Sequence, residues 1–237
     1  MGSVFLLTVR QTTGRLRLVI MGVLASLPVF FAIMVVRSSR APSVVEFEQV
    51  ALGGMLAGSI LPLVVLAVAI VVFGNELEDR TLANLTLSPL PRWKIVLPKW
   101  LAAVVVSGSF MVLSAGITGH VAFNADWRAT YAVTASTVTG VLLYTSLFVW
   151  LGLKSSKAIG FGLAYVIVWE GFFAGFVSSI RFLSIRHYAI ALMHGLDLRR
   201  FATDAHVGLG ATIAVSLAVV GGFLFLSVRQ LRRMDIP

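Results

Sequence analysis

The residues best suited to polar chemistry are concentrated in residues 74–94, between two long apolar runs. Glu76, Glu78, Asp79 and Arg80 follow one another closely here, and no other part of the sequence carries charge so densely. The interval also carries leucines, but its apolar pattern is too short to cross a membrane. We therefore expect it to lie outside the bilayer and to present leucines and charges to another molecule.

The first part of this interval is predicted to be a short amphipathic helix. Asn75 can cap its N-terminus, and Glu78 stands where a capping box places its acid. Pro89 and Pro91 then end the helix, because proline lacks the amide donor and restricts the residue before it. The stripe that this helix would present consists of Leu77, Thr81, Leu82 and Leu85.

Glu170 is the one acid that falls inside a predicted membrane crossing. Counted from the start of that crossing at about 1.5 Å per residue, it lies roughly 18 Å in, near the middle of a core about 30 Å thick. A buried acid there is costly and commonly functional, so it could contact a substrate, pair with Arg181 or Arg186, or be protonated. An equally weighted alternative is a structural hydrogen bond to a neighbouring helix.

The other titratable residues give no catalytic or metal-binding pattern. No pair of histidines has a ligand spacing such as H-x-x-x-H, and the sequence has no cysteine for a disulfide or a thiolate site. No serine or aspartate falls into an evident catalytic triad, so we expect this chain to bind no metal or cofactor itself. We interpret the four histidines as surface residues: His120, His187, His194 and His206.

Two pairs of glycines recur at four-residue spacing, Gly54 with Gly58 and Gly171 with Gly175. Small residues at this spacing let helix backbones approach closely in a membrane, where lipid offers no hydrophobic driving force. We expect them to serve helix packing within one subunit. The more specific alternative is a dimer seam, an interface between two copies of the chain, along the fifth predicted crossing.

The composition identifies the class of protein that holds these residues. Of the 237 residues, 58% are apolar and 12% are charged, and the mean hydropathy is +0.95. These values exclude an ordinary soluble protein and indicate a polytopic membrane protein. The net charge of +9 comes from bases scattered between apolar runs. Bases in this arrangement are expected to set membrane topology and not to form a surface that binds nucleic acid.

The predicted fold is all-α, a single transmembrane domain over residues 1–237 with six membrane-spanning helices. Residues 1–17 suit an interfacial helix, with an unstructured tail as the alternative. The first apolar run is expected to stay as an anchor and not to be removed as a signal peptide. Residues 180–206 suit one or two short outer helices. The predicted crossings are 18–36, 49–73, 95–119, 131–153, 158–179 and 207–228.

Six crossings place both termini on one side, and the distribution of bases indicates which side. The segments on the side of the termini hold 12 of the 19 lysine and arginine residues, Lys99 among them. This bias favours both termini in the cytoplasm, with residues 74–94 on the same side. Four tryptophans near predicted ends suit an aromatic belt: Trp93, Trp100, Trp127 and Trp150.

The stretch NELEDRTLANLTLSPLPRWKIVLPKWLA resembles the segment between the second and third crossings of type-two ABC transporter permeases. YVIVWEGFFAGF followed by LSIRHYAI is similar to the fifth crossing and outer loop of family members. In that family the first segment contains the coupling helix, which seats in a groove of a separate ATPase subunit. The resemblance therefore implies coupling roles for Glu76, Glu78, Asp79, Arg80, Thr81, Leu82 and Leu85. The alternative is a solvated loop that only sets topology.

The resemblance also implies the assembly, a permease homodimer with two ATPase subunits in a prokaryotic inner membrane. The sequence has no G-x-x-x-x-G-K-[ST] loop, so ATP and Mg²⁺ are expected on the partner and this chain is not an enzyme by itself. Substrate would pass along crossings one, two and five, with Glu170 a candidate contact. A membrane-embedded protein that docks a cytoplasmic partner without transport is the alternative, and an intramembrane enzyme ranks last.

Overall fold

The computed structural model describes residues 2–38, 43–78, 91–155, 157–173, 183–201 and 207–233. Within these ranges the protein consists of helices and turns, with no strand. Two of the helices, η1 and η2, are π-helices, which have wider turns than α-helices. The elements are α1 (Gly2–Thr12), α2 (Arg15–Arg37), α3 (Val44–Phe47), η1 (Glu48–Ile60), α4 (Leu61–Ala69), α5 (Val71–Glu78), α7 (Trp93–Ala122), α8 (Trp127–Lys154), α9 (Ala158–Ala164), η2 (Tyr165–Phe173), α11 (Ile185–Leu196) and α12 (Leu209–Arg233).

Five helices in the described part of the chain are long and apolar enough to cross a membrane. They are α2, the continuous run Val44–Gly74, α7, α8 and α12. The fifth predicted crossing, 158–179, is represented by a shorter apolar helix, Ala158–Phe172, because residues 174–182 lie outside the described ranges. The all-helical membrane fold is thus confirmed, whereas the fifth crossing, and with it the count of six, stays a prediction.

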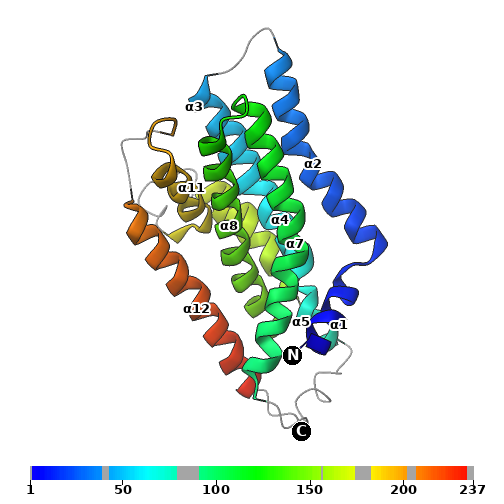
Figure 1. The fold of residues 1–237 in the computed structure, drawn as a ribbon. Helices are drawn as coiled ribbons and strands as arrows, with labels where there is room; N and C mark the ends of the chain where they lie inside the picture. Colours follow the sequence, from blue (N-terminus) through cyan, green and yellow to red (C-terminus); the bar gives the residue numbers. More distant parts are fainter. Residues whose placement is uncertain are drawn as a thin grey trace.

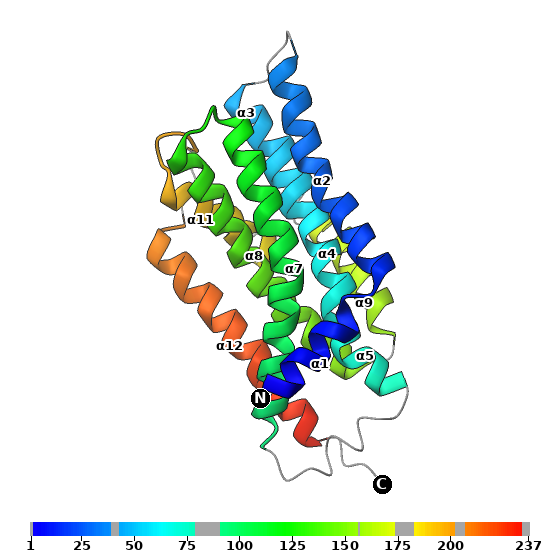
Figure 2. The same ribbon diagram turned by 45° about the vertical axis from the view of Figure 1, so that its right-hand side comes forward.

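The helices form an up-and-down bundle with α7 and α8 at its centre (Figure 1). Helix α2 packs on α7, and α12 packs mainly on α8, so these two form opposite flanks of the bundle in both views (Figure 2). Both carry many exposed apolar side chains, as expected of helices that face lipid. Helix α1 and the end of α12 lie at the same end of the bundle, which we call the termini end.

Local sequence explains where several helices begin. The side chain of Asp126 accepts the backbone N–H of Arg128 and so caps the N-terminus of α8. Ser43 and Glu46 form a complete capping box at α3. Between α7 and α8 the chain reverses in a short turn in which Asn124 and Ala125 have φ values of 50° and 63°, in the left-handed region.

The structure extends several helices beyond the boundaries that hydropathy suggests. Helix α7 begins at Trp93 and α8 at Trp127, before the predicted starts at 95 and 131. Apolar runs mark only the part of a helix that suits lipid, whereas the helix itself continues to its caps. In the predicted outer region, 180–206, the described residues contain one helix, α11, of 12 residues.

Candidate functional site

The predicted coupling segment, 74–94, joins two helices that meet at the termini end. Helix α5 ends at Glu78 and α7 begins at Trp93, and both of these ends point to that end of the bundle (Figure 2). Glu76 and Glu78 lie in the last turn of α5. The other coupling residues fall outside the described residues, so their role stays a prediction: Asp79, Arg80, Thr81, Leu82 and Leu85.

The prediction that Asn75 begins a separate helix is wrong. Asn75 lies inside α5, whose backbone is helical from Val71 to Glu78. The backbone N–H of Gly74 donates to the carbonyl of Ile70 at 2.8 Å, so the helix continues past the glycine without a break. The capping preference of asparagine is therefore overridden by the helix that precedes it.

Lys99, at the termini end, is counted in the sequence analysis among the bases that set topology. The structure shows that it is also a buried residue, only 1% exposed. Its Nζ donates to the carbonyl oxygen of Val72 at 2.9 Å and lies 4.5 Å from the centre of the Phe73 ring. Helical spacing from the buried residues Val96 and Ala103 is the signal that could have revealed its burial.

Trp100 follows directly and holds α7 to a different helix. Its indole Nε1 donates to the hydroxyl of Ser146 in α8 at 3.0 Å, and the side chain is 8% exposed. It is therefore a buried packing residue and not part of an aromatic belt. Trp93 and Trp127, which are 45% and 77% exposed, are placed as such a belt requires.

Glu170 is fully buried and holds the start of α11. Its Oε1 accepts the hydroxyl of Tyr165 and the backbone N–H of Ile185, both at 2.9 Å. Its Oε2 accepts the hydroxyl of Ser184 at 2.5 Å. A carboxylate here satisfies an orphan N–H of the first helical turn and is favoured by the helix dipole. These bonds favour the structural alternative, and contact with a transported molecule stays a prediction.

Arg186, the second residue of α11, lies against two glycines of η1. A Cβ atom on Gly58 would be 3.0 Å from its Nη1, and one on Gly53 would be 3.4 Å from its Nη2. The absence of side chains at these positions lets the guanidinium approach the η1 backbone. Gly58 therefore faces a helix of its own chain, as packing within one subunit requires.

The other three glycines of the predicted seam have different surroundings. A Cβ on Gly54 would meet the carbonyl of Gln49, in its own helix, at 3.2 Å. Gly171 is exposed, with the carbonyl of Val166 as its near neighbour at 3.5 Å. Gly175 lies outside the described residues. A dimer seam along the fifth crossing thus stays a prediction.

Comparison with known families identifies this arrangement. A family model described as ABC-2 family transporter protein matches residues 13–183, which include residues 74–94 and Glu170. The chain belongs to the ABC-2 transporter family. The resemblance of its polar interval to type-two ABC permeases is thus confirmed. A search among curated proteins gave no match for this ABC-2 protein.

Family membership establishes the general role of the ABC-2 protein. Members are membrane transport components that are not themselves catalytic and normally work with an ATPase subunit. The apolar helices agree with a multi-pass membrane protein. In the described part of the chain no cluster of three or more histidine, aspartate or glutamate side chains could hold a metal ion.

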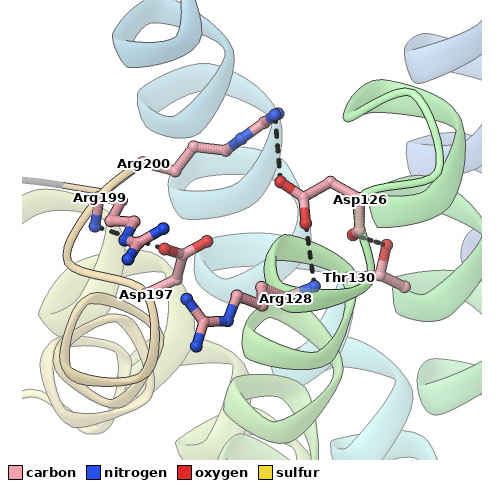
Figure 3. A network of polar contacts seen from close by, with 6 residues as sticks. All are labelled: Asp126, Arg128, Thr130, Asp197, Arg199 and Arg200. Atoms are coloured by element: carbon pink, nitrogen blue, oxygen red, sulfur yellow. Dashed lines mark hydrogen bonds and ion pairs between the residues drawn. The ribbon is translucent and has the colours of Figure 1, made fainter.

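At the end opposite the termini, an ion pair and a contact between a histidine and a carboxylate connect α11 and the segment after it to the rest of the ABC-2 protein. Arg200, in the segment after α11, pairs with Asp126 at 3.1 Å, and Asp126 also caps α8 (Figure 3). His194 of α11 pairs with Glu48 of η1, so the interpretation of His194 as a lone surface histidine is wrong. These partners are far apart in the sequence, and their pairing could not be read from it.

Proposed function

We propose that this ABC-2 protein is the permease subunit of an ATP-driven ABC exporter. Two copies would form the substrate path, and each would be coupled through residues 74–94 to a separate ATPase subunit. The observation that carries the proposal is the match to the ABC-2 family. In this chain, α5 ends and α7 begins at the termini end, on either side of the charged interval. The distribution of bases supports a cytoplasmic location for that end, in a prokaryotic inner membrane.

The mechanism follows from what a motor outside the bilayer can do. ATP hydrolysis on a partner can move these helices only through a contact whose strength differs between nucleotide states. Leu82 and Leu85 would fill an apolar groove of the ATPase, while the acids of the interval and Arg80 would make polar contacts around the edge of that groove. Because the interval joins the ends of α5 and α7, a displacement of the interval would be transmitted to both helices.

The substrate path is proposed to run along α2, the run Val44–Gly74 and the apolar helix Ala158–Phe172. Glu170 lies on the last of these, but two of its three hydrogen bonds join it to the start of α11 and the third comes from Tyr165 in its own helix. Its contribution to a path would therefore be to position α11 beside η1. The path in such a dimer would be closed or opened by the rearrangement of these elements.

The proposal is tested by co-expressing the chain with an ABC ATPase encoded beside it, purifying the complex and measuring ATP turnover. The double variant Leu82→Asp and Leu85→Asp should lose the ATPase or its modulation, because two acids cannot be buried in an apolar groove. Leu198→Asp is the matched control, since Leu198 is exposed near the opposite end of the bundle.

Three results would count against the proposal. An ATPase that stays bound and modulated in the double variant would refute coupling through residues 74–94. A wild-type chain that binds no ATPase would refute the permease assignment. A complex with unaltered ATP turnover in every nucleotide state would favour a docking protein that transports nothing.

A further inference from the structure

We propose that Lys99 is the positioning residue that couples α5 to α7, so that both helices move as one body when residues 74–94 are displaced. This inference rests on the proposed function and deepens it. Lys99 lies in the second turn of α7, and Val72 and Phe73 lie at the start of α5. The contact therefore joins the helix that enters the coupling segment to the helix that leaves it.

The contact is more specific than ordinary helix packing. Burying an ammonium group is costly unless hydrogen bonds and contacts with an aromatic ring compensate for the lost hydration. The carbonyl of Val72 at 2.9 Å and the ring of Phe73 at 4.5 Å are two such compensating contacts. Both partners are themselves buried, so the ammonium lies in a low-dielectric environment where these interactions are strong.

The surroundings of Lys99 show why its position suits a coupling role. In a membrane, contact between the apolar faces of two helices has no hydrophobic driving force, since lipid is equally apolar, so interhelical hydrogen bonds help to set their relative position. A hydrogen bond from Lys99 to one main-chain carbonyl fixes the axial position of α7 relative to α5. The next residue, Trp100, bonds to Ser146 and fixes α7 to α8 in the same way. Helix α1 packs against both α5 and α7 at this end.

The experiment uses the permease–ATPase complex in phospholipid nanodiscs. A nitroxide is placed on Leu113→Cys, since Leu113 is an exposed residue of α7 and the chain has no cysteine of its own. The distance between labels on the two copies is measured by electron spin resonance, without nucleotide and after trapping with ATP and vanadate. Lys99→Met removes the charge and keeps the stem, and Lys99→Arg restores a charged donor.

We expect Lys99→Met to bind the ATPase and hydrolyse ATP while the nucleotide-dependent change in label distance falls at least about fivefold, and Lys99→Arg to recover part of it. Lys154→Met is the control, because Lys154 is exposed at the same end and stacks on Trp150 at 4.9 Å. A full distance change in Lys99→Met would overturn the inference. If Lys99→Met does not fold, Lys99→Gln replaces it, because its side chain is shorter and uncharged, and a full change there would overturn the inference equally.

A second measurement separates this inference from the proposed function. In the permease alone, Lys99→Met should speed the amide hydrogen exchange of residues 71–78, because α5 loses its tie to α7. Unchanged exchange would overturn the inference, whether or not an ATPase binds. A wild-type chain that binds no ATPase would refute the proposed function and with it the coupling role of Lys99. The exchange result would then report only whether Lys99 holds α5 against α7.

Discussion

The carboxylate of Glu170 accepts the backbone N–H of Ile185 at 2.9 Å, so a residue of η2 caps the first turn of α11. The same carboxylate receives the hydroxyls of Tyr165 and Ser184. A fully buried acid at this position thus connects two segments that the sequence separates by 15 residues. These contacts give Glu170 a structural role that does not depend on a substrate.

Replacing Glu170 should therefore destabilise the protein. Glu170→Leu leaves three donors without their acceptor and should lower the free energy of unfolding by at least about 2 kcal/mol. Glu170→Gln keeps one carbonyl oxygen and should cost less. The measurement is SDS-induced unfolding in mixed micelles, followed by tryptophan fluorescence.

Glu46→Gln is the matched control for this experiment. Glu46 is an exposed acid in the capping box of α3, where glutamine serves as well, so its change should stay within about 0.5 kcal/mol. Equal stability of Glu170→Leu and wild type would show that these hydrogen bonds contribute nothing. Loss of transport in a fully stable Glu170→Gln would instead restore the substrate-contact alternative.

Two glycines in neighbouring helices should respond to alanine in opposite directions. A Cβ on Gly152 would be 2.8 Å from the carbonyl oxygen of Ile70, a backbone atom that cannot move alone. Gly152→Ala should cost about 1–3 kcal/mol by overpacking. Gly160 has no such neighbour within 4 Å, and Gly160→Ala should stabilise its helix by about 0.5–1 kcal/mol.

The same unfolding assay compares these two variants directly. No destabilisation by Gly152→Ala would contradict the close approach of α8 to residue 70, and destabilisation by Gly160→Ala would contradict the open space beside Gly160. The pair is informative because both changes add one methyl group to a glycine of a membrane helix.

The turn between α7 and α8 stores strain at Ala125. Its φ of 63° puts an L side chain in the left-handed region, which costs roughly 1 kcal/mol for alanine and nothing for glycine. Ala125→Gly should therefore raise the unfolding free energy, by less than about 1 kcal/mol because glycine also gains freedom in the unfolded chain. Asn124→Gly is the control and should gain less, since asparagine tolerates this conformation. A loss of stability in Ala125→Gly would contradict the strained turn.

The sequence predicts the parts of this fold that depend on local pattern. Apolar runs located the long helices, and the density of charge located the interval between α5 and α7. The burial of Lys99 and Trp100 was not predicted, because a base or a tryptophan near the end of a run resembles an interface residue. Their burial depends on Val72 and Ser146, 27 and 46 residues away, and such pairings are set by tertiary packing.

The same limit applies to α11 and its contacts. The interleaved apolar and basic residues predict one or two short helices between residues 180 and 206, but they could not indicate that Glu170 caps α11 or that Arg186 lies on the glycines of η1. The π-helical form of η1 and η2 leaves no local signal either, because the same residues also suit an α-helix. The acid inside a crossing was recognised as important, but its partner was not.

Asp126 and Arg200 form an ion pair in which the two residues should have unequal importance. The pair is about one-third exposed, with side-chain exposures of 36% for Arg200 and 34% for Asp126, so its own contribution should lie within about 0–1 kcal/mol. Asp126 has a second role, because its side chain caps α8 by accepting the N–H of Arg128. Asp126→Ala should therefore cost about 1 kcal/mol more than Arg200→Ala.

Asparagine at this position separates the two roles. Asp126→Asn keeps the capping oxygen and loses the charge, so it should match Arg200→Ala and not Asp126→Ala. High salt should narrow the difference between wild type and Arg200→Ala, because an exposed pair is screened, and should leave the cap unaffected. Were Arg200→Ala to cost as much as Asp126→Ala in the unfolding assay, the ion pair rather than the cap would hold the end of α8 in place.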